Sequence, residues 1–262
     1  MQPKVKWSTK MSYSSVATFH TCAQGAAGGE ILSPPAATRI EISSVFQRFA
    51  EAEVLCGIDL EVTQRRVAVV GANGSGKSTF ARLLNGLVLP SAGTVRIDGL
   101  CTARDTKAVR RKVGFVFQNP DTQIVFPTVE EDVAFGLKGL KLSAPERAAR
   151  VEAVLDHYGL GALRGQSAHK LSGGQKQLLA IAGVLITKPD CVIFDEPTTL
   201  LDLRNARKVA QAIAELPQTA VVVTHDLGLV AAFDRVLVFD KGRVVADDVP
   251  NRALDAYVRR MQ

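Results

Sequence analysis

RVAVVGANGSGKST, residues 66–79, joins a β-branched apolar run to a glycine-rich loop, and a helical run, ARLLNGL, follows. The loop meets the pattern G-x-x-x-x-G-K-[ST] in the strand, loop and helix setting that the pattern requires. Glycines at positions 71, 74 and 76 let backbone N–H groups turn toward phosphate oxygens, and the helix N-terminus adds partial positive charge. We therefore expect a nucleotide site in which Lys77 reaches the β- and γ-phosphates and Ser78 binds Mg²⁺.

Apolar runs of the same kind recur along the chain, with helical patterns between them. The clearest predicted strands cover residues 67–70, 113–117, 192–194, 220–224 and 236–239. Continuous apolar runs suit strands buried on both faces, so we expect an α/β fold with a mostly parallel sheet covered by helices. The stretch from about 119 to 170 is helix-rich, and Ser143 with Glu146 forms a capping box there. This pattern predicts a helical insertion in an α/β core.

Two further motifs carry chemistry. CVIFDE, residues 191–196, is an apolar strand that ends in two carboxylates, which point in different directions because side chains alternate along a strand. We expect Asp195 to join the Mg²⁺ shell and Glu196 to polarise an attacking water. LSGGQ, residues 171–175, precedes an apolar helix that starts near Gly174, and this makes a second anion site. A bound ATP has a single γ-phosphate, and this phosphate does not need both the Walker A type loop and a second anion site in one pocket.

Length and composition indicate a globular protein of one or two domains and argue against a membrane-spanning or disulfide-stabilised protein. The 262 residues fit one large domain or two small ones, and the 47% of hydrophobic residues supply a core without disulfides. The longest apolar run, residues 178–186, is shorter than the ~20 residues that a bilayer span needs. Dispersed cysteines at positions 22, 56, 101 and 191 argue against a disulfide framework or a zinc site. The net charge of +6 allows nucleic acid, an anionic membrane surface or a phosphorylated ligand as a partner.

Together these motifs resemble those of the nucleotide-binding subunits of ATP-binding-cassette (ABC) transporters. The resemblance covers residues 39–262, while residues 1–38, rich in Ser, Ala, Gly and Thr, are expected to form a flexible N-terminal extension. It implies a P-loop NTPase (RecA-like) core, a small antiparallel β subdomain and a helical subdomain inserted at about 119–170. Gln118 matches the family's Q-loop, His225 its switch histidine, Asp202 its D-loop aspartate, and Phe49 an aromatic residue that stacks on adenine.

The family's site residues carry over onto this sequence motif by motif. The resemblance implies Glu196, His225 and Gln118 as catalytic residues, and Ser78, Gln118 and Asp195 as Mg²⁺ ligands. The ATP-binding residues that it implies are Phe49, Gly71, Ala72, Asn73, Gly74, Ser75, Gly76, Lys77, Ser78, Thr79, Ser172, Gly173, Gly174, Gln175 and Asp202. It also implies a head-to-tail dimer with an identical or different ATPase subunit. Each ATP would then lie between the Walker A loop, residues 71–79, of one chain and the LSGGQ motif of the other.

FQNPDTQIVFPTVEEDVAFG, residues 117–136, resembles the Q-loop region of energy-coupling-factor (ECF) importers, which take up vitamins and transition-metal ions. The compact chain is similar to the ATPase of the three-part biotin importer, with cobalt or nickel import as the alternative. This resemblance implies a transmembrane scaffold subunit, a substrate-binding membrane subunit and a peripheral position on the cytoplasmic face of the cell membrane. Glu130, Glu131 and Asp132 would offer the scaffold's basic coupling helix an acidic surface. The alternative is that these acids only stabilise a helix N-terminus.

Two other classes of function share part of these motifs: a soluble cassette ATPase of iron–sulfur assembly and a nucleotide-binding module that has lost its activity. The joint presence of Lys77, Asp195, Glu196 and His225 argues against lost activity, and the segment 117–136 favours transport. We interpret the basic residues of the segment 96–112 as a solvated face rather than a nucleic-acid site. The sequence therefore predicts an ATPase that energises transmembrane import and binds no nucleic acid.

Overall fold

The computed structural model describes residues 36–261, which belong to one compact unit. Most of the predicted extension, and Cys22 with it, lies outside the described residues. Within them, Cys56, Cys101 and Cys191 are free thiols, and Cys101 and Cys191 are buried. No helix of this described part is long and apolar enough to cross a bilayer.

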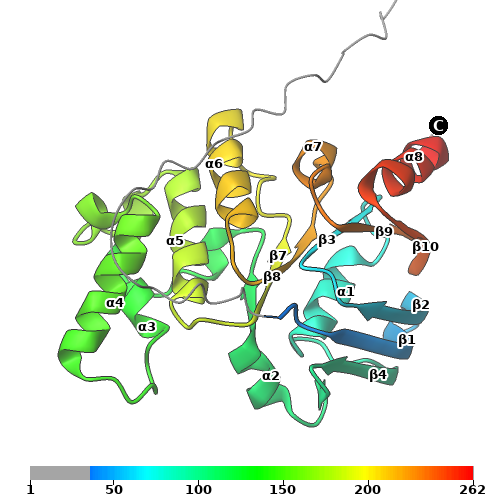
Figure 1. Ribbon diagram of the computed structural model, residues 1–262, viewed down its shortest axis with the longest axis horizontal. Coiled ribbons are helices and arrows are strands. Elements are labelled where there is room, and N and C mark those ends of the chain that lie inside the picture. The colour runs from blue at the N-terminus through cyan, green and yellow to red at the C-terminus, as the bar shows by residue number, and fades with distance from the viewer. Residues whose placement is uncertain (1–35, 262) are drawn as a thin grey trace, which may run out of the picture. The chain divides into compact units, whose positions relative to one another are not determined.

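In the described chain, six strands form the central sheet, in the order β10-β9-β3-β8-β7-β6 (Figure 1). Neighbouring strands are parallel except β9 and β10, which are antiparallel. All five predicted strands are confirmed as members of this sheet, and β7 and β8 are buried along their whole length. The bounds are β3 Arg66–Gly71, β6 Val113–Val116, β7 Cys191–Asp195, β8 Thr219–Val223, β9 Arg235–Asp240 and β10 Arg243–Asp248.

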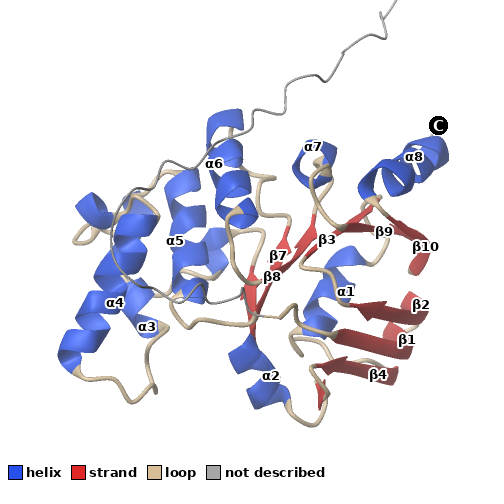
Figure 2. Ribbon diagram, in the orientation of Figure 1, coloured by secondary structure: helices blue, strands red, loops and turns tan. Residues whose placement is uncertain are grey.

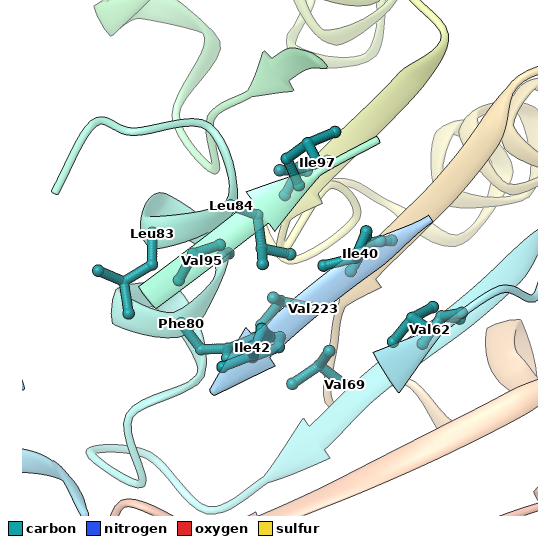
Figure 3. Close-up of a cluster of buried hydrophobic side chains, with 14 of the residues drawn as sticks. Ile40, Ile42, Val62, Val69, Phe80, Leu83, Leu84, Val95, Ile97 and Val223 are labelled. Carbon is teal, nitrogen blue, oxygen red and sulfur yellow. The ribbon is translucent and has the colours of Figure 1, made fainter. Parts of the chain in front are cut away.

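A second, antiparallel sheet has the order β2-β1-β4-β5, as the family resemblance implied. Its strands are β1 Ile40–Phe49, β2 Ala52–Val62, β4 Ala92–Ile97 and β5 Leu100–Cys101. Helix α1, Lys77–Leu84, shares one buried cluster with both sheets, and Figure 3 shows Phe80 and Leu84 of this helix beside Ile42 and Val95. This shared core holds the start of α1 at the end of β3.

The two faces of the central sheet have separate cores because side chains alternate along β3. Val67 and Val69 face the cluster with α1, whereas Ala68 and Val70 face a second cluster. Figure 2 shows the helices gathered around the sheet. Besides α1, the elements outside the two sheets and the helical region are α2 Thr106–Lys112, α6 Leu203–Ala214, α7 Leu227–Val230 and α8 Pro250–Met261.

A helical region lies to one side of the central sheet and has its own hydrophobic cluster. The cluster joins α3, α4 and α5 through residues such as Val133, Leu155 and Leu179. The predicted capping box is confirmed, because Ser143 N donates to Glu146 Oε2 at 2.8 Å and Ser143 is the N-cap of α4. The elements here are η1 Pro120–Thr122, α3 Val129–Phe135, α4 Ala144–His157, η2 Gly161–Leu163, η3 Ala168–Lys170 and α5 Gly173–Leu185.

The predicted acidic surface at the start of α3 is wrong for Asp132, whereas Glu130 and Glu131 reach the surface. Asp132 is only 8% exposed, and its Oδ1 accepts hydrogen bonds from Val125 N at 2.8 Å and Phe126 N at 3.0 Å. Glu131 caps the helix with Thr128, and Glu130 pairs with Arg164 at 2.7 Å. These acids stabilise the helix start and the loop before it, which is the alternative that the sequence left open.

Candidate functional site

The Walker A loop between β3 and α1 encloses the Lys77 side chain. Its Nζ donates to Gly71 O at 2.8 Å and to Ala72 O at 2.9 Å, and the residue is only 6% exposed. Burial lowers the pKa of Lys77, while the carboxylates of Glu196 and Asp195 oppose that shift. An ammonium group has three donors, so one donor of Lys77 remains for a further acceptor such as a phosphate oxygen.

At two positions of this loop only glycine fits, because neighbouring atoms approach the backbone too closely for a Cβ and because the backbone has a positive φ. Gly76, at φ 100°, is the N-cap of α1, and a Cβ there would lie 2.8 Å from Leu55 Cδ2 and 2.9 Å from Val54 O. A Cβ on Gly71 would overlap the carbonyl oxygen of Phe239. Neighbouring strands therefore press on the loop from outside, and side chains at these positions would displace it.

Ser78 and Asp195 lie together at the start of α1. Ser78 Oγ donates to Asp195 Oδ1 at 2.7 Å, and Arg82 lies 3.6 Å from the same carboxylate. Burial raises the pKa of Asp195, although the bond from Ser78 and the charge of Arg82 act in the opposite direction. A hydroxyl and a carboxylate are the hard oxygen donors that Mg²⁺ prefers, so these two residues fit the predicted metal.

Glu196 follows β7 in a strained conformation and turns toward a different neighbour. Its φ of 52° lies in the left-handed region, and its backbone N–H donates to Val223 O at 2.9 Å. Its Oε2 accepts a hydrogen bond from Thr199 Oγ1 at 2.9 Å and lies 2.8 Å from His225 Nδ1. The divergence predicted for Asp195 and Glu196 is confirmed, and strain of this kind is concentrated at functional sites.

One cavity of about 700 Å³ brings most of the predicted residues together, a volume that suits a nucleotide. Three different loops contribute Gln118, Glu196 and His225, which follow β6, β7 and β8. These strands are parallel, so their carboxyl ends meet at one edge of the sheet. The lining residues are Val54, Gly71, Ala72, Asn73, Gly74, Gly76, Lys77, Ser78, Thr79, Gln118, Glu196, Thr199, His225 and Tyr257.

Some predicted residues do not line this cavity. Asp195 is buried behind Ser78. Ser75 is 4% exposed, and its hydroxyl lies under the loop beside Gly71, without a hydrogen-bond partner in the described chain. Phe49 lies at the end of β1 and is 48% exposed, so it is not a core residue. It is not among the residues that line the cavity.

The LSGGQ motif also lies outside the cavity. Ser172 is the N-cap of α5, and Ser172 N donates to Gln175 Oε1 at 2.9 Å in a capping box. Gly174 packs directly against Asn205, whose side chain donates to Asp202 at 2.9 Å. The helix begins at Gly173, in agreement with the predicted start near Gly174, and Asn205 holds the motif beside the D-loop aspartate.

Sequence reasoning missed four residues of the site. Arg82 stands one helical turn after Ser78, so i, i+4 spacing could have placed it beside Asp195. Thr199 lies three residues after Glu196 in an irregular segment with no periodic signal. Val54 and Tyr257 come from β2 and α8, and only the tertiary structure brings them to the Walker A loop.

Comparison with known proteins shows that this chain is similar to ATP-binding proteins of ABC transporters. The family model described as ABC transporter matches residues 56–199. A Deinococcus radiodurans protein described as an ABC transporter ATP-binding protein, with no substrate named, is 62% identical over 222 residues, which cover 85% of this chain and 98% of that protein. The biotin transport ATP-binding protein BioM of Rhizobium etli is 48% identical over 218 residues, 83% of this chain and 97% of that protein.

Two further similarities concern subfamily and assembly. The energy-coupling factor transporter ATP-binding protein EcfA1 of Clostridium novyi is 40% identical over 223 residues, 80% of each chain. An ATP-binding cassette solved as a dimer in a post-hydrolysis state, bound to ADP and Pi, matches with a TM-score of 0.72 at 28% identity, over 80% of this chain and 98% of that one. With the Walker A cavity and the Glu196–His225 pair in place, the chain belongs to the ATP-binding proteins of the ABC transporter family and is an ABC ATPase.

Proposed function

We propose that the chain hydrolyses ATP to energise an ECF-type importer and that the imported substrate is biotin. The ATPase chemistry is supported by the contact of 2.8 Å between Glu196 and His225 in the cavity that Lys77 lines. The ECF type and the substrate are supported by the similarity to EcfA1 and BioM.

The residues of the cavity have separate roles in this proposal. Lys77 donates to the β- and γ-phosphates of ATP, and the N–H groups of the Walker A loop bind the same oxygens. Mg²⁺ held by Ser78, Asp195 and Gln118 would neutralise phosphate charge. Glu196 accepts a proton from the attacking water and orients it toward the γ-phosphate, while His225 keeps the Glu196 carboxylate in place.

A second ATPase subunit is needed to complete the site. The start of α5 is a capped helix N-terminus suited to phosphate, yet it does not line the cavity of its own chain. In a head-to-tail dimer, Ser172, Gly173, Gly174 and Gln175 of one subunit would contact the ATP that the other subunit holds. Leu200 and Leu203 beside Asp202 are 63% and 69% exposed, and apolar side chains this exposed suit burial against that subunit.

The membrane partners are proposed from the same similarity and from a second cavity. This cavity, of about 360 Å³, lies between β6, α3 and α5 and is lined by Phe115, Val125, Phe135 and Val184 among others. Val125 and Phe135 are 65% and 45% exposed. We assign this apolar groove, in place of the acidic run, to a helix of the transmembrane scaffold subunit, which works with a substrate-binding membrane subunit. The chain would then lie peripherally on the cytoplasmic face of the membrane.

A complementation experiment tests the function. Cells that lack the chain receive either the wild type or Glu196→Gln, and uptake of labelled biotin, cobalt and nickel is measured. We expect the wild type alone to restore biotin uptake, and Glu196→Gln to bind ATP as a dimer without turnover.

Other outcomes point to the alternatives. Restored metal uptake with unchanged biotin uptake would assign the chain to a cobalt or nickel importer. No change in any uptake, together with co-purification of no membrane protein, would favour a soluble ATPase. Near-normal hydrolysis by Glu196→Gln would remove Glu196 from its catalytic role.

A further inference from the structure

Basic side chains from two separate elements border the apolar groove that we assign to the scaffold subunit. Arg110 of α2 lines this groove, and Phe135 of α3 lines it as well. Lys138 follows α3, and its Nζ lies 5.8 Å from the centroid of the Phe135 ring. The groove is therefore apolar inside and basic at its border.

The helix α2 turns two of its cations toward solvent. Val109 is the buried residue of this helix, and Lys107 and Arg111 stand two positions before and after it. At 3.6 residues per turn, both side chains point away from the buried side. Both are exposed, and neither has a hydrogen bond or an ion pair with another residue of the described chain. Their donors are free for an acceptor outside the chain.

The acids near α2 do not pair with these two cations. Asp98 lies 2.9 Å from Lys112 Nζ, and Asp105 Oδ2 accepts a hydrogen bond from Cys101 N at 2.9 Å. Both carboxylates are thus held by other groups of their own segment. The exposed side of α2 keeps a net positive charge.

The connection between α3 and α4 adds an apolar side chain to the same kind of surface. Lys138 and Lys141 are exposed, and Leu140 between them is 42% exposed. In Figure 1 this connection and α2 both lie along the lower edge of the described chain. A leucine flanked by lysines suits a membrane interface, where the apolar side chain enters among the lipids and the cations stay at the phosphates.

This surface stays free when a second subunit closes the nucleotide site. The loops that supply Gln118, Glu196 and His225 follow the carboxyl ends of β6, β7 and β8. The helix α2 instead ends at Lys112, directly before β6 begins. The nucleotide site and α2 therefore lie at opposite ends of β6, and a subunit that covers one end leaves the other uncovered.

We propose that this basic surface contacts anionic lipid headgroups directly. The basic surface consists of Lys107, Arg111, Lys138, Leu140 and Lys141. The inference rests on the proposed importer function, because a scaffold helix in the neighbouring groove would bring the surface to the bilayer. Lipid phosphates would supply the acceptors that Lys107 and Arg111 lack within the described chain. Nucleic acid is the competing polyanion, but it offers Leu140 no apolar environment.

Co-sedimentation with vesicles tests the contact. The full chain is mixed with vesicles of phosphatidylcholine, with or without phosphatidylglycerol. We expect binding to the anionic vesicles only, and weaker binding as the salt concentration rises. The double variant Lys107→Gln and Arg111→Gln should lower the partition coefficient about 25-fold, because each basic residue near an anionic surface contributes about fivefold.

A matched control comes from α6. Arg207 and Lys208 are also an exposed arginine and an exposed lysine without a hydrogen bond or an ion pair in the described chain. Figure 1 shows α6 at the upper edge, away from α2. Arg207→Gln with Lys208→Gln removes the same charge and should change the partition coefficient less than about twofold.

A change at Leu140 separates a membrane from a polyanion. Leu140→Ser keeps every charge of the basic surface and removes its exposed apolar side chain. Vesicle binding should fall about threefold or more, because an apolar side chain that enters the interface is lost.

Four results would overturn the lipid contact. These are equal binding to anionic and neutral vesicles, an equal loss in the α2 and α6 variants, wild-type vesicle binding by Leu140→Ser, and binding of a labelled oligonucleotide without binding of anionic vesicles. The importer function fails separately, since a chain that binds anionic vesicles but restores no uptake would refute the importer and keep the lipid contact.

Discussion

Asp132 provides the sharpest test of how the acidic run at the start of α3 works. We consider the substitution Asp132→Ala, which removes the Oδ1 atom that accepts hydrogen bonds from Val125 N and Phe126 N. If the acids existed to bind a partner, this change would leave the isolated chain unaffected. If the carboxylate instead holds the loop before α3, the free energy of unfolding should fall.

The magnitude follows from the two hydrogen bonds. A hydrogen bond to a charged group contributes about 1.5–3 kcal/mol. Both bonds are partly buried, so water can replace the carboxylate only in part, and we expect a total loss of about 2–4 kcal/mol. Asp132→Asn keeps an oxygen at the Oδ1 position and loses only the charge, so its cost should be about 1 kcal/mol.

Urea denaturation followed by circular dichroism measures these losses as shifts of the midpoint at constant slope. Glu130→Ala is the surface control, because its ion pair with Arg164 is exposed and should contribute under about 1 kcal/mol. Equal midpoints for Asp132→Ala and Glu130→Ala, or an asparagine variant as unstable as the alanine variant, would refute the assignment of Asp132 as a buried acceptor.

Three further predictions concern the site itself. Burial raises the pKa of Asp195, so its ionised carboxylate destabilises the fold above that pKa, and the cost disappears as the pH falls toward the unfolded value. Asp195→Asn should therefore raise the melting temperature of the nucleotide-free chain near neutral pH, by a margin that shrinks in acid; an equal or lower melting temperature near neutral pH would contradict this. Gly174→Ala would bring its Cβ to 2.7 Å from Asn205 Cβ and should cost about 1–3 kcal/mol in urea, whereas an unchanged midpoint would show that α5 and α6 can separate freely. Leu200→Ser, introduced beside Glu196→Gln, should weaken the ATP-held dimer roughly tenfold in sedimentation experiments if Leu200 is buried there, and an unaltered dimer would remove Leu200 from the interface.

Short sequence patterns were sufficient to predict those parts of the fold that depend on interactions between residues close together in the chain. The Walker A loop, the five parallel strands and the capping box at Ser143 each follow from a short segment whose chemistry allows few alternatives. The grouping of Gln118, Glu196 and His225 was also predictable, because loops after parallel strands meet at one edge of the sheet.

Charge and membership of a motif were poor guides where side-chain direction decided the outcome. The run Glu130–Asp132 looked like a surface, yet a helix start turns its third acid inward to the preceding loop. Ser75 belongs to the Walker A pattern, but its hydroxyl lies beneath the loop. Neither orientation is encoded in the residue type, because each depends on which neighbours the folded chain supplies.

The sequence by itself determined a P-loop α/β ATPase of the ABC family and most of the residues that line its cavity, because those residues lie within short motifs of defined backbone geometry. Only the tertiary structure decided which residues from distant elements complete the lining of the cavity. Val54 and Tyr257 lie far apart in the chain, and both line the cavity because β2 is hydrogen-bonded to the β9–β10 turn and α8 packs on β9 and β10. Contacts of this range leave no periodic signal in the sequence, since they arise from packing between elements rather than within one.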